Sequence, residues 1–519
     1  MGLILKTTFF LAVSILYFWS VVGYGKTLTN KNSIYFENYL NGSIIILIFS
    51  YIIYLTIGTS LTINLIIIFI GLILFFLKKE KAKSITNKSI FLLLLSVFSV
   101  LIISKTHEDF NGYHYFTIFE IFNHNLRIGV TNLNERFFHS SLLALNQSFL
   151  VMPYLDFKLV HLPSFFIYFS VIGYFITILF SRIAKSNEIF YSLLCLLIMI
   201  IKFNRLSEFG YDYLTQFILL IVFHKIYFLH TDSDEVIKAI LYFVFTILIK
   251  PVSLLFAPIL IFIVYKKGIL IFKNISKLRY LLICSLLIIL FSSSFFKTGC
   301  LFYPLKQTCF SVENISWSEI ELVKKHSNIV SSWAKGYYAQ DKTEYNKIDN
   351  EELFNQNFNW LKYWIEFHFF YKVFEFLLII FGSIILIYFY FDKDKSYLDN
   401  KKKDNLILIF LSLVSIIFWL NTIPQFRFGF SLILIFLYLL LDYIFNLKIF
   451  FDKKKFFHIF IFGLIILNLK NIDRIYSELE RNDFYKFKNF PFYNEKIIKN
   501  DYSNLNREKI LHIEILNKL

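Results

Sequence analysis

Long apolar stretches separated by short polar segments run through most of this 519-residue chain. Most are roughly 16 to 22 residues long, and a helix of that length crosses a hydrocarbon core about 30 Å thick. The pattern predicts an all-α polytopic membrane protein with about fourteen transmembrane helices. We place these spans near residues 3–22, 41–58, 60–77, 89–104, 161–181, 188–202, 212–229, 237–249, 252–265, 280–296, 373–391, 405–421, 428–446 and 456–470. The pair flanking Lys250-Pro251 is short, so one helix kinked at the proline is the alternative there.

Lysine residues are concentrated in three short polar segments. Residues 78–88 carry five Lys and one Glu, residues 266–279 carry four Lys and one Arg without an acid, and residues 448–455 carry four Lys and one Asp. Because loops rich in Lys and Arg stay on the cytoplasmic side, we expect these three segments there. Counting crossings from them places both termini outside, together with the long polar segments 105–160, 297–372 and 471–519.

Composition agrees with a membrane protein, because 57% of the residues are hydrophobic and the mean hydropathy is +0.60. The net charge of +16 follows from the loop lysines, so we expect the lipid bilayer and no nucleic acid as a partner. We expect N-terminal transmembrane helices over 1–77, a transmembrane domain over 78–470 with external loops 105–160 and 297–372, and a polar extracytoplasmic tail over 471–519. The working surface would be the periplasmic face of a bacterial inner membrane.

Two of the four cysteines, Cys300 and Cys309, lie in the segment GCLFYPLKQTC, which the charge count places outside. An oxidising periplasm favours a disulfide between them, and two unpaired thiols are the alternative. The rest of this segment, 310–372, is expected to fold over the bundle as a small periplasmic cap.

The most informative chemical feature is an apolar span that runs directly into His107, Glu108 and Asp109, with Tyr113 and His114 just beyond. Ionisable groups at a membrane face are costly and mark a functional site. Adjacent carboxylates repel each other, so the pKa of at least one should be shifted, which suits a general base.

Other ionisable residues are predicted on the same external side. Each of them also has a simpler structural interpretation. Lys250 could be a lysine that reaches the membrane interface, Arg205 could form an ion pair with Glu208 or Asp212, and Arg427 could be an interface anchor. Glu108 and Asp109 could likewise be a solvated loop end. Together with Lys335, these residues place carboxylates and cations around one membrane-level cleft, which suits a lipid-linked phosphate donor and a hydroxyl acceptor.

The order of an apolar span, Glu108-Asp109, an amphipathic helix that opens with Tyr113-His114, and a polar turn after Gly129 resembles the first extracytoplasmic loop of the GT-C superfamily. These are integral-membrane glycosyltransferases that use polyprenyl-phosphate-linked sugars. Lys250-Pro251 resembles their Lys-Pro helix break, and Phe426-Arg427-Phe428 resembles their late Arg-aromatic turn. HEDFNGYHY, NRLSEFGYD and PQFRFG together resemble bacterial membrane proteins associated with surface polysaccharides. The resemblance covers roughly 90–435, although three extra spans precede the acidic loop and no WWDxG-type signature is found.

This resemblance implies a GT-C-like bundle with an extracytoplasmic juxtamembrane helix, and transfer of a sugar from polyprenyl phosphate to a glycan or lipid acceptor of the cell envelope. Asp109 would be the base, and Glu108 and His114 would position the acceptor or tune the base. Arg427, Lys250 and Arg205 would hold the donor phosphate. The superfamily sometimes holds a divalent ion such as Mg²⁺ or Mn²⁺ at such carboxylates, so the metal stays open.

Two other functions remain as alternatives: an O-antigen or capsule polymerase or ligase, and a transporter or flippase of lipid-linked glycans. A polymerase or ligase should have catalytic Arg and His residues in a large late periplasmic loop. The loop 297–372 contains no Arg, which argues against this function. A transporter should have charged residues near the bilayer midplane, whereas the ionisable residues here are predicted at one membrane face. The D-x-D sequences at 232–234 and 392–394 match nucleotide-sugar transferases, but without a βαβ domain they are expected to be solvated charges.

Overall fold

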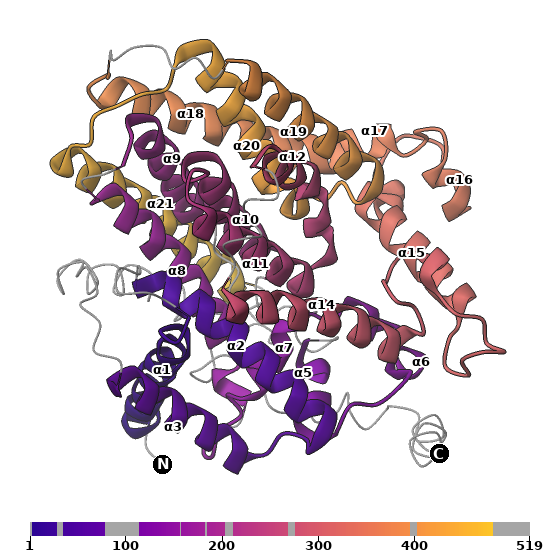
Figure 1. The fold of residues 1–519 in the computed structure, drawn as a ribbon. Helices are drawn as coiled ribbons and strands as arrows, with labels where there is room; N and C mark the ends of the chain where they lie inside the picture. The colour runs from indigo at the N-terminus through magenta and orange to yellow at the C-terminus, as the bar shows by residue number, and fades with distance from the viewer. Residues whose placement is uncertain are drawn as a thin grey trace.

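The computed structural model describes residues 3–28, 35–77, 114–155, 157–181, 184–202, 211–267, 276–394 and 402–480. Within these ranges the chain is helical and has no strands beyond two isolated bridges. The prediction of an all-α protein is therefore confirmed at this level (Figure 1).

Three helices open the chain: α1 (Leu3–Gly25), α2 (Tyr35–Thr56) and α3 (Leu61–Leu77). They pack closely because glycines stand at their contacts. A Cβ added to Gly25 would lie 1.7 Å from the carbonyl oxygen of Asn38, and one added to Gly42 would lie 1.8 Å from that of Val21. Small residues at such contacts let membrane helices approach each other backbone to backbone.

Short helices then lead into the centre of the bundle. They are α5 (Tyr115–Asn123), α6 (Val130–Leu133), a 3-10 turn (Glu135–His139) and α7 (Leu143–Ser148). The expected amphipathic helix is α5, and its residues Tyr115, Ile118 and Ile121 are buried. Phe157 stacks against Phe119 at 6.0 Å between ring centroids, so this helix packs on protein along much of its surface.

The central helices are α8 (Leu162–Leu179), α9 (Ser186–Lys202), α10 (Tyr211–Phe228), α11 (Ser233–Ile249), α12 (Ala257–Lys267) and α14 (Lys277–Thr298). Lys250 ends α11, and Pro251 begins a 3-10 turn (Pro251–Phe256) that leads into α12. Lys266 at the far end of α12 forms an ion pair with Asp404, so the chain reverses at the proline instead of continuing as one kinked helix.

The remaining helices form the cap and the last membrane segments. The cap contains α15 (Ile320–Lys335), a 3-10 turn (Tyr337–Lys342), α16 (Glu351–Asn355) and α17 (Leu361–Trp364). A π-helical turn (Ile365–Phe374) continues into α18 (Glu375–Tyr390), followed by α19 (Lys402–Thr422), α20 (Phe426–Phe445) and α21 (Lys453–Glu480). Figure 1 shows α15, α16 and α17 together on the right, beside the end of α14.

Eight helices of the described chain are long and apolar enough to cross a membrane: Thr8–Gly25, Tyr35–Thr56, Leu162–Leu179, Lys277–Thr298, Leu361–Tyr390, Asp404–Thr422, Phe426–Phe445 and Lys453–Asp473. Two shorter apolar helices are Leu61–Leu77 and Pro251–Lys266. A multi-pass membrane protein is thus supported, and fourteen spans stay a prediction. One expected span, 89–104, lies outside the described residues.

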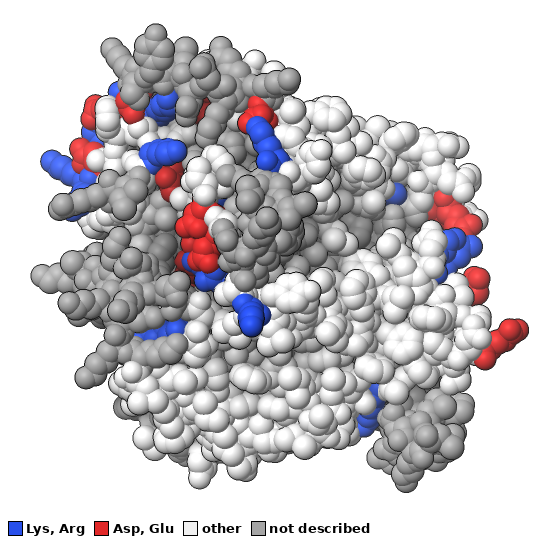
Figure 2. All heavy atoms as spheres, in the orientation of Figure 1, with Lys and Arg blue, Asp and Glu red and all other residues white. Residues whose placement is uncertain are grey.

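The two ends of the helix bundle are distinguished by the segments that connect the helices there. We call the end that carries residues 299–360 the cap end, and the end at which α8, α10, α12, α18 and α20 finish the loop end. In Figure 2 most charged side chains of the visible face lie toward its left and right edges, with largely uncharged surface between them. The described parts of the lysine-rich segments 266–279 and 448–455 both lie at the loop end, as the predicted topology requires.

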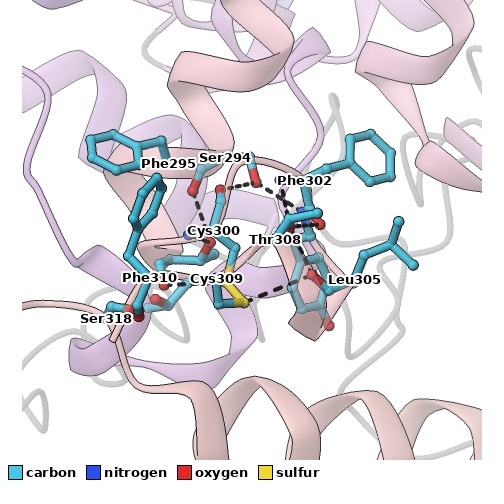
Figure 3. The surroundings of a disulfide bond; sticks show 12 residues. Ser294, Phe295, Cys300, Phe302, Leu305, Thr308, Cys309, Phe310 and Ser318 are labelled. Carbon is cyan, nitrogen blue, oxygen red and sulfur yellow. Dashed lines mark hydrogen bonds between the residues drawn. A yellow bond between two sulfur atoms is a disulfide. The ribbon is translucent and has the colours of Figure 1, made fainter. Parts of the chain in front are cut away.

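The expected disulfide joins Cys300 to Cys309 at the cap end (Figure 3). Leu301 N–H donates to Thr308 across the hairpin at 3.0 Å, and Phe310 N–H donates to Gly299 at 3.1 Å. The side chain of Ser294 on α14 donates to the carbonyl of Cys300 at 2.9 Å, which joins the hairpin to the end of the helix.

Helix α21 is longer than the last predicted span, 456–470. The helix runs to Glu480, ten residues beyond the predicted end of the span at 470. Loss of apolar character marks the end of the membrane segment better than it marks the end of the helix. The rest of the tail, 481–519, lies outside the described residues.

Candidate functional site

Three charged side chains meet at the cap end of the bundle, each from a different part of the chain. Asp212 lies in the first turn of α10, Lys250 ends α11, and Arg427 lies in the first turn of α20. The ammonium of Lys250 is 3.3 Å from one carboxylate oxygen of Asp212, and Nε of Arg427 is 3.1 Å from the other. We call these three residues the Asp212 triad.

The Asp212 triad is partly open to solvent. The side chains of Lys250, Asp212 and Arg427 are 15%, 16% and 27% exposed. The group carries two positive charges and one negative charge, so its formal net charge is +1. Such a group can accept an anion while the carboxylate keeps both cations in place, because each cation retains an existing partner.

His114 borders the Asp212 triad through Tyr211. The rings of His114 and Tyr211 meet edge to face with centroids 4.9 Å apart, and His114 is buried. The hydroxyl of Tyr211 donates a hydrogen bond to the side-chain oxygen of Gln147. His114 therefore lies at the same end of α10 that carries Asp212.

The cap covers one side of the Asp212 triad. The guanidinium carbon of Arg427 is 5.3 Å from the ring centroid of Trp333 on α15, a cation–π contact, and Trp333 is 38% exposed. The side-chain amide of Gln425, just before α20, donates to the carbonyl of Ala334 at 3.2 Å. These contacts fix the last turn of α15 over the start of α20.

A second ion pair lies in the segment after α5. Nε of Arg127 is 3.1 Å from Glu120, and both side chains are at most 10% exposed. Burial raises the pKa of Glu120 to about 7, against the opposing attraction of Arg127. The pair joins α5 to the chain that leads into α6.

The structure brings together three of the six predicted catalytic and phosphate-binding residues. His114, Lys250 and Arg427 lie around Asp212. Glu108, Asp109 and Arg205 lie outside the described residues, as does His107, so their positions stay predictions. In the described part of the chain, no three His, Cys, Asp or Glu side chains are grouped so that they could hold a metal.

Asp212 was considered in the sequence only as a partner of Arg205. A signal was nevertheless available, because Asp212 is an acid at the start of an apolar helix, as Lys250 is a base at the end of one. Acids and bases at the same predicted membrane face could have been paired with one another.

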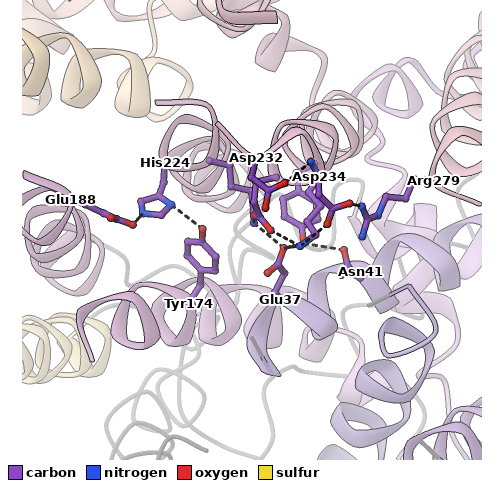
Figure 4. Close-up of polar contacts among 12 residues, drawn as sticks. Glu37, Asn41, Tyr174, Glu188, His224, Asp232, Asp234 and Arg279 are labelled. Atoms are coloured by element: carbon purple, nitrogen blue, oxygen red, sulfur yellow. Dashed lines mark hydrogen bonds and ion pairs between the residues drawn. The ribbon is translucent and has the colours of Figure 1, made fainter. Parts of the chain in front are cut away.

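A larger buried ion network lies at the loop end, between α2, α10, α11 and α14 (Figure 4). The ammonium of Lys225 on α10 is 2.8 Å from Glu37 on α2 and also pairs with Glu235 on α11. Lys238 is 2.6 Å from Glu235 and 3.6 Å from Glu37. The side chains of Glu37 and Lys225 are only 3% and 1% exposed, so each is stabilised chiefly by the other charges.

The same network includes Asp234 of the 232–234 segment. Asp234 of the 232–234 segment was expected to be a solvated charge, and its side chain is 41% exposed, but it also pairs with Arg279 of α14 and lies 3.6 Å from Lys238. Asp232 caps α11 by accepting a hydrogen bond from the N–H of Asp234 at 2.8 Å. The segment therefore has a structural role. Asp392 is 74% exposed and pairs with Lys455 at 2.9 Å, closer to the expectation.

A buried hydrogen-bonded chain extends the loop-end contacts to α8 and α9. The hydroxyl of Tyr174 is 2.9 Å from Nδ1 of His224, and Nε2 of His224 is 2.9 Å from Glu188 (Figure 4). Both ring nitrogens of this fully buried histidine therefore have partners. These hydrogen bonds link α8, α9 and α10 through polar side chains that hydropathy alone would not place together.

A comparison with protein families matches residues 3–434 to the family described as "Domain of unknown function (DUF8201)". No curated protein and no solved structure matches the chain. The matched region contains all three residues of the Asp212 triad and all of the loop-end network described above.

Proposed function

The family match covers most of the chain, so the protein belongs to the DUF8201 family, and we propose that it is a GT-C-type glycosyltransferase of the bacterial inner membrane. It would transfer a sugar from a polyprenyl-phosphate donor to a glycan or lipid acceptor of the cell envelope. The reaction would take place at the cap end, on the periplasmic face.

The observation that carries this proposal is the convergence of Lys250 and Arg427 on Asp212. Both cations were selected from the sequence as phosphate ligands, and they are 177 positions apart in the chain (427 − 250). Arg can hold a phosphate through two parallel hydrogen bonds, and Lys adds a point charge. The net positive charge and the partial exposure of the triad both suit an anionic leaving group.

In the proposed reaction, the acceptor hydroxyl attacks the anomeric carbon of the donor sugar. Asp109 takes the proton of that hydroxyl, and the bond between the anomeric carbon and the phosphate oxygen breaks. The polyprenyl phosphate leaves with the bonding electrons, and Arg427 and Lys250 stabilise its charge, which we expect to be the largest electrostatic contribution. Glu108 and His114 would orient the acceptor or tune Asp109.

The exposed part of Trp333 offers a place for a sugar ring beside the proposed phosphate ligands. Trp333 contacts Arg427, and aromatic faces bind the apolar faces of sugars while hydroxyl groups remain solvated. A sugar on this ring would lie next to the Asp212 triad.

The test uses the purified full-length protein in lipid vesicles without an ion gradient. Sugar transfer from a polyprenyl-phosphate donor would be measured together with donor binding. Asp109→Asn should lower turnover by roughly 10²- to 10⁴-fold and leave donor binding intact. Arg427→Lys should weaken both donor binding and turnover, since a point charge does not replace the two parallel hydrogen bonds.

The matched control is Glu352→Gln, which changes a surface carboxylate of the cap that pairs with Lys324 at 3.5 Å. It should keep normal transfer. A flippase needs no general base, so normal glycan assembly in cells that carry Asp109→Asn at wild-type protein level would exclude the transferase at this site.

A further inference from the structure

Lys335 of the cap is a buried lysine without an acidic partner. It is the last residue of α15, only 4% exposed, and Gly336 ends the helix in the left-handed conformation at φ 97°. Its ammonium is 5.1 Å from the ring centroid of Trp360, a cation–π contact. Within the described chain it has no ion pair and no side-chain hydrogen bond.

Lys225 of the loop-end network shows how acidic partners stabilise a buried lysine. Lys225, whose side chain is 1% exposed, is 2.8 Å from Glu37 and also pairs with Glu235. An ammonium removed from water without a carboxylate costs several kcal/mol. Burial lowers the pKa of Lys335 to about 8, and no neighbouring carboxylate raises it.

The surroundings of Lys335 are aromatic. Trp360 is buried, and the ring of Phe358 lies 6.0 Å from it and is 58% exposed. Phe358 and the preceding Asn357 both have positive φ values, 58° and 50°, which is costly for residues other than glycine. A cation against aromatic rings, with one ring open to solvent, suits a sugar that carries an acidic group.

We propose that Lys335 and Trp360 form a second binding site, in the cap, that holds the anionic group of a glycan. The chemistry common to its ligands is a cluster of anionic oxygens, either the carboxylate of an acidic sugar or the phosphates of a lipid-linked glycan. The ligand supplies the negative charge that the protein lacks at this position.

This site is separate from the Asp212 triad. Trp333, which contacts Arg427, precedes Lys335 by two positions on α15, and helical residues two apart project from different faces. The proposal therefore holds whether or not sugar transfer occurs at the triad, and its test needs no transfer reaction.

The first experiment measures the reactivity of Lys335 itself. Full-length protein in lipid nanodiscs is treated with an amine-acylating reagent at pH 8, where a lysine with a pKa of about 8 is half neutral, and labelling is followed residue by residue by mass spectrometry. At a probe concentration about ten times its Kd, labelling of Lys335 should slow by about tenfold. The probes are inorganic pyrophosphate and trigalacturonate, and the one that protects identifies the source of the anion.

Lys347 is the matched control, because it is a cap lysine that is 55% exposed and pairs with Asp341 at 3.2 Å. Its labelling should not respond to either probe. Equal protection of Lys347, no protection of Lys335 by either probe, or failure of the reagent to reach Lys335 would each overturn the proposal.

A second experiment separates binding from a structural role by thermal unfolding. Lys335→Met removes the charge and keeps most of the length of the side chain, so the variant without ligand should be as stable as the wild type or more stable. It should lose the stabilisation that the protecting probe gives through this site, while Lys335→Arg and the control variant Lys347→Met should keep it. Lower stability of Lys335→Met without ligand, or an unchanged response to the probe, would show that Lys335 serves the fold alone.

Discussion

Replacement of Asp212 by Asn tests whether the cations of the Asp212 triad depend on this carboxylate. The substitution keeps the size of the side chain and removes its charge. Lys250 and Arg427 would then face each other as like charges without their shared partner. We expect a less stable protein that binds anions more readily.

The magnitude follows from the geometry. At separations of 3.1 and 3.3 Å, and with an effective dielectric constant of about 20, each attraction is on the order of 5 kcal/mol before solvation is counted. Removing one partner of a fully buried pair costs about 3–5 kcal/mol. Because these side chains are 15% to 27% exposed, solvent would screen part of the loss. We therefore expect a loss of about 2–3 kcal/mol in the free energy of unfolding.

The assay is thermal unfolding of purified Asp212→Asn in nanodiscs, with and without inorganic pyrophosphate. Without the anion, Tm should fall by a few degrees. With it, most of the loss should be recovered, because the anion takes the place of the carboxylate between the two cations. Glu352→Gln, in which one charge of an exposed pair is lost, should change neither value.

Two results would refute this reasoning. An unchanged Tm in Asp212→Asn would mean that the triad contributes no net stability. A lowered Tm that pyrophosphate does not restore would mean that Lys250 and Arg427 cannot accept an anion at this position, and the proposed donor site would lose its support.

Three further predictions concern topology, the loop-end network and pH. A cysteine at Asn421 should react with an impermeant thiol reagent from outside the cell and one at Ser84 should not; the reverse pattern would invert the predicted topology. Lys225→Met should cost about 3–5 kcal/mol, seen as a loss of folded protein in detergent, and Glu37→Gln added to it should recover part of the yield; normal yield of the single variant would contradict the role of the ion pair. Because burial raises the pKa of Glu120 from 4.5 to about 7, the folded state holds this proton more tightly, so stability should fall as pH rises from 4.5 to 7. Thermal unfolding across this range should show a weaker pH dependence in Glu120→Gln than in the wild type.

Hydropathy was sufficient to predict helices and their order, because each membrane-crossing segment must satisfy its own backbone hydrogen bonds. The predicted break at Lys250-Pro251 coincides with the 3-10 turn between α11 and α12, and the segment after α14 forms short helices. Hydropathy predicted the ends of helices less well where polar residues lie within a buried helix. The predicted second span starts at 41, yet α2 begins at Tyr35, since Glu37 and Asn41 are partnered by Tyr242 of α11.

The candidate site shows the same limit. Lys250 and Arg427 could be selected individually, because a cation at the end of an apolar helix is costly and therefore informative. Their shared contact with Asp212 depends on how three helices pack, which no local pattern contains. The ion pair of Asp234 was not predicted for the same reason, since its partner Arg279 comes from a helix that begins 43 residues later (277 − 234).

The two charged regions of the bundle are connected by the same pair of helices. Helix α10 carries Asp212 at the cap end and Lys225 at the loop end, and α11 carries Glu235 at the loop end and is followed by Lys250. A shift of one residue along α11 would move Lys250 by about 1.5 Å and turn it by about 100° around the helix axis. Such a shift would break its contact with Asp212 and also separate Glu235 from Lys225. The ion pairs at the loop end therefore restrict the register of α11 against α10, and that register places Lys250 beside Asp212.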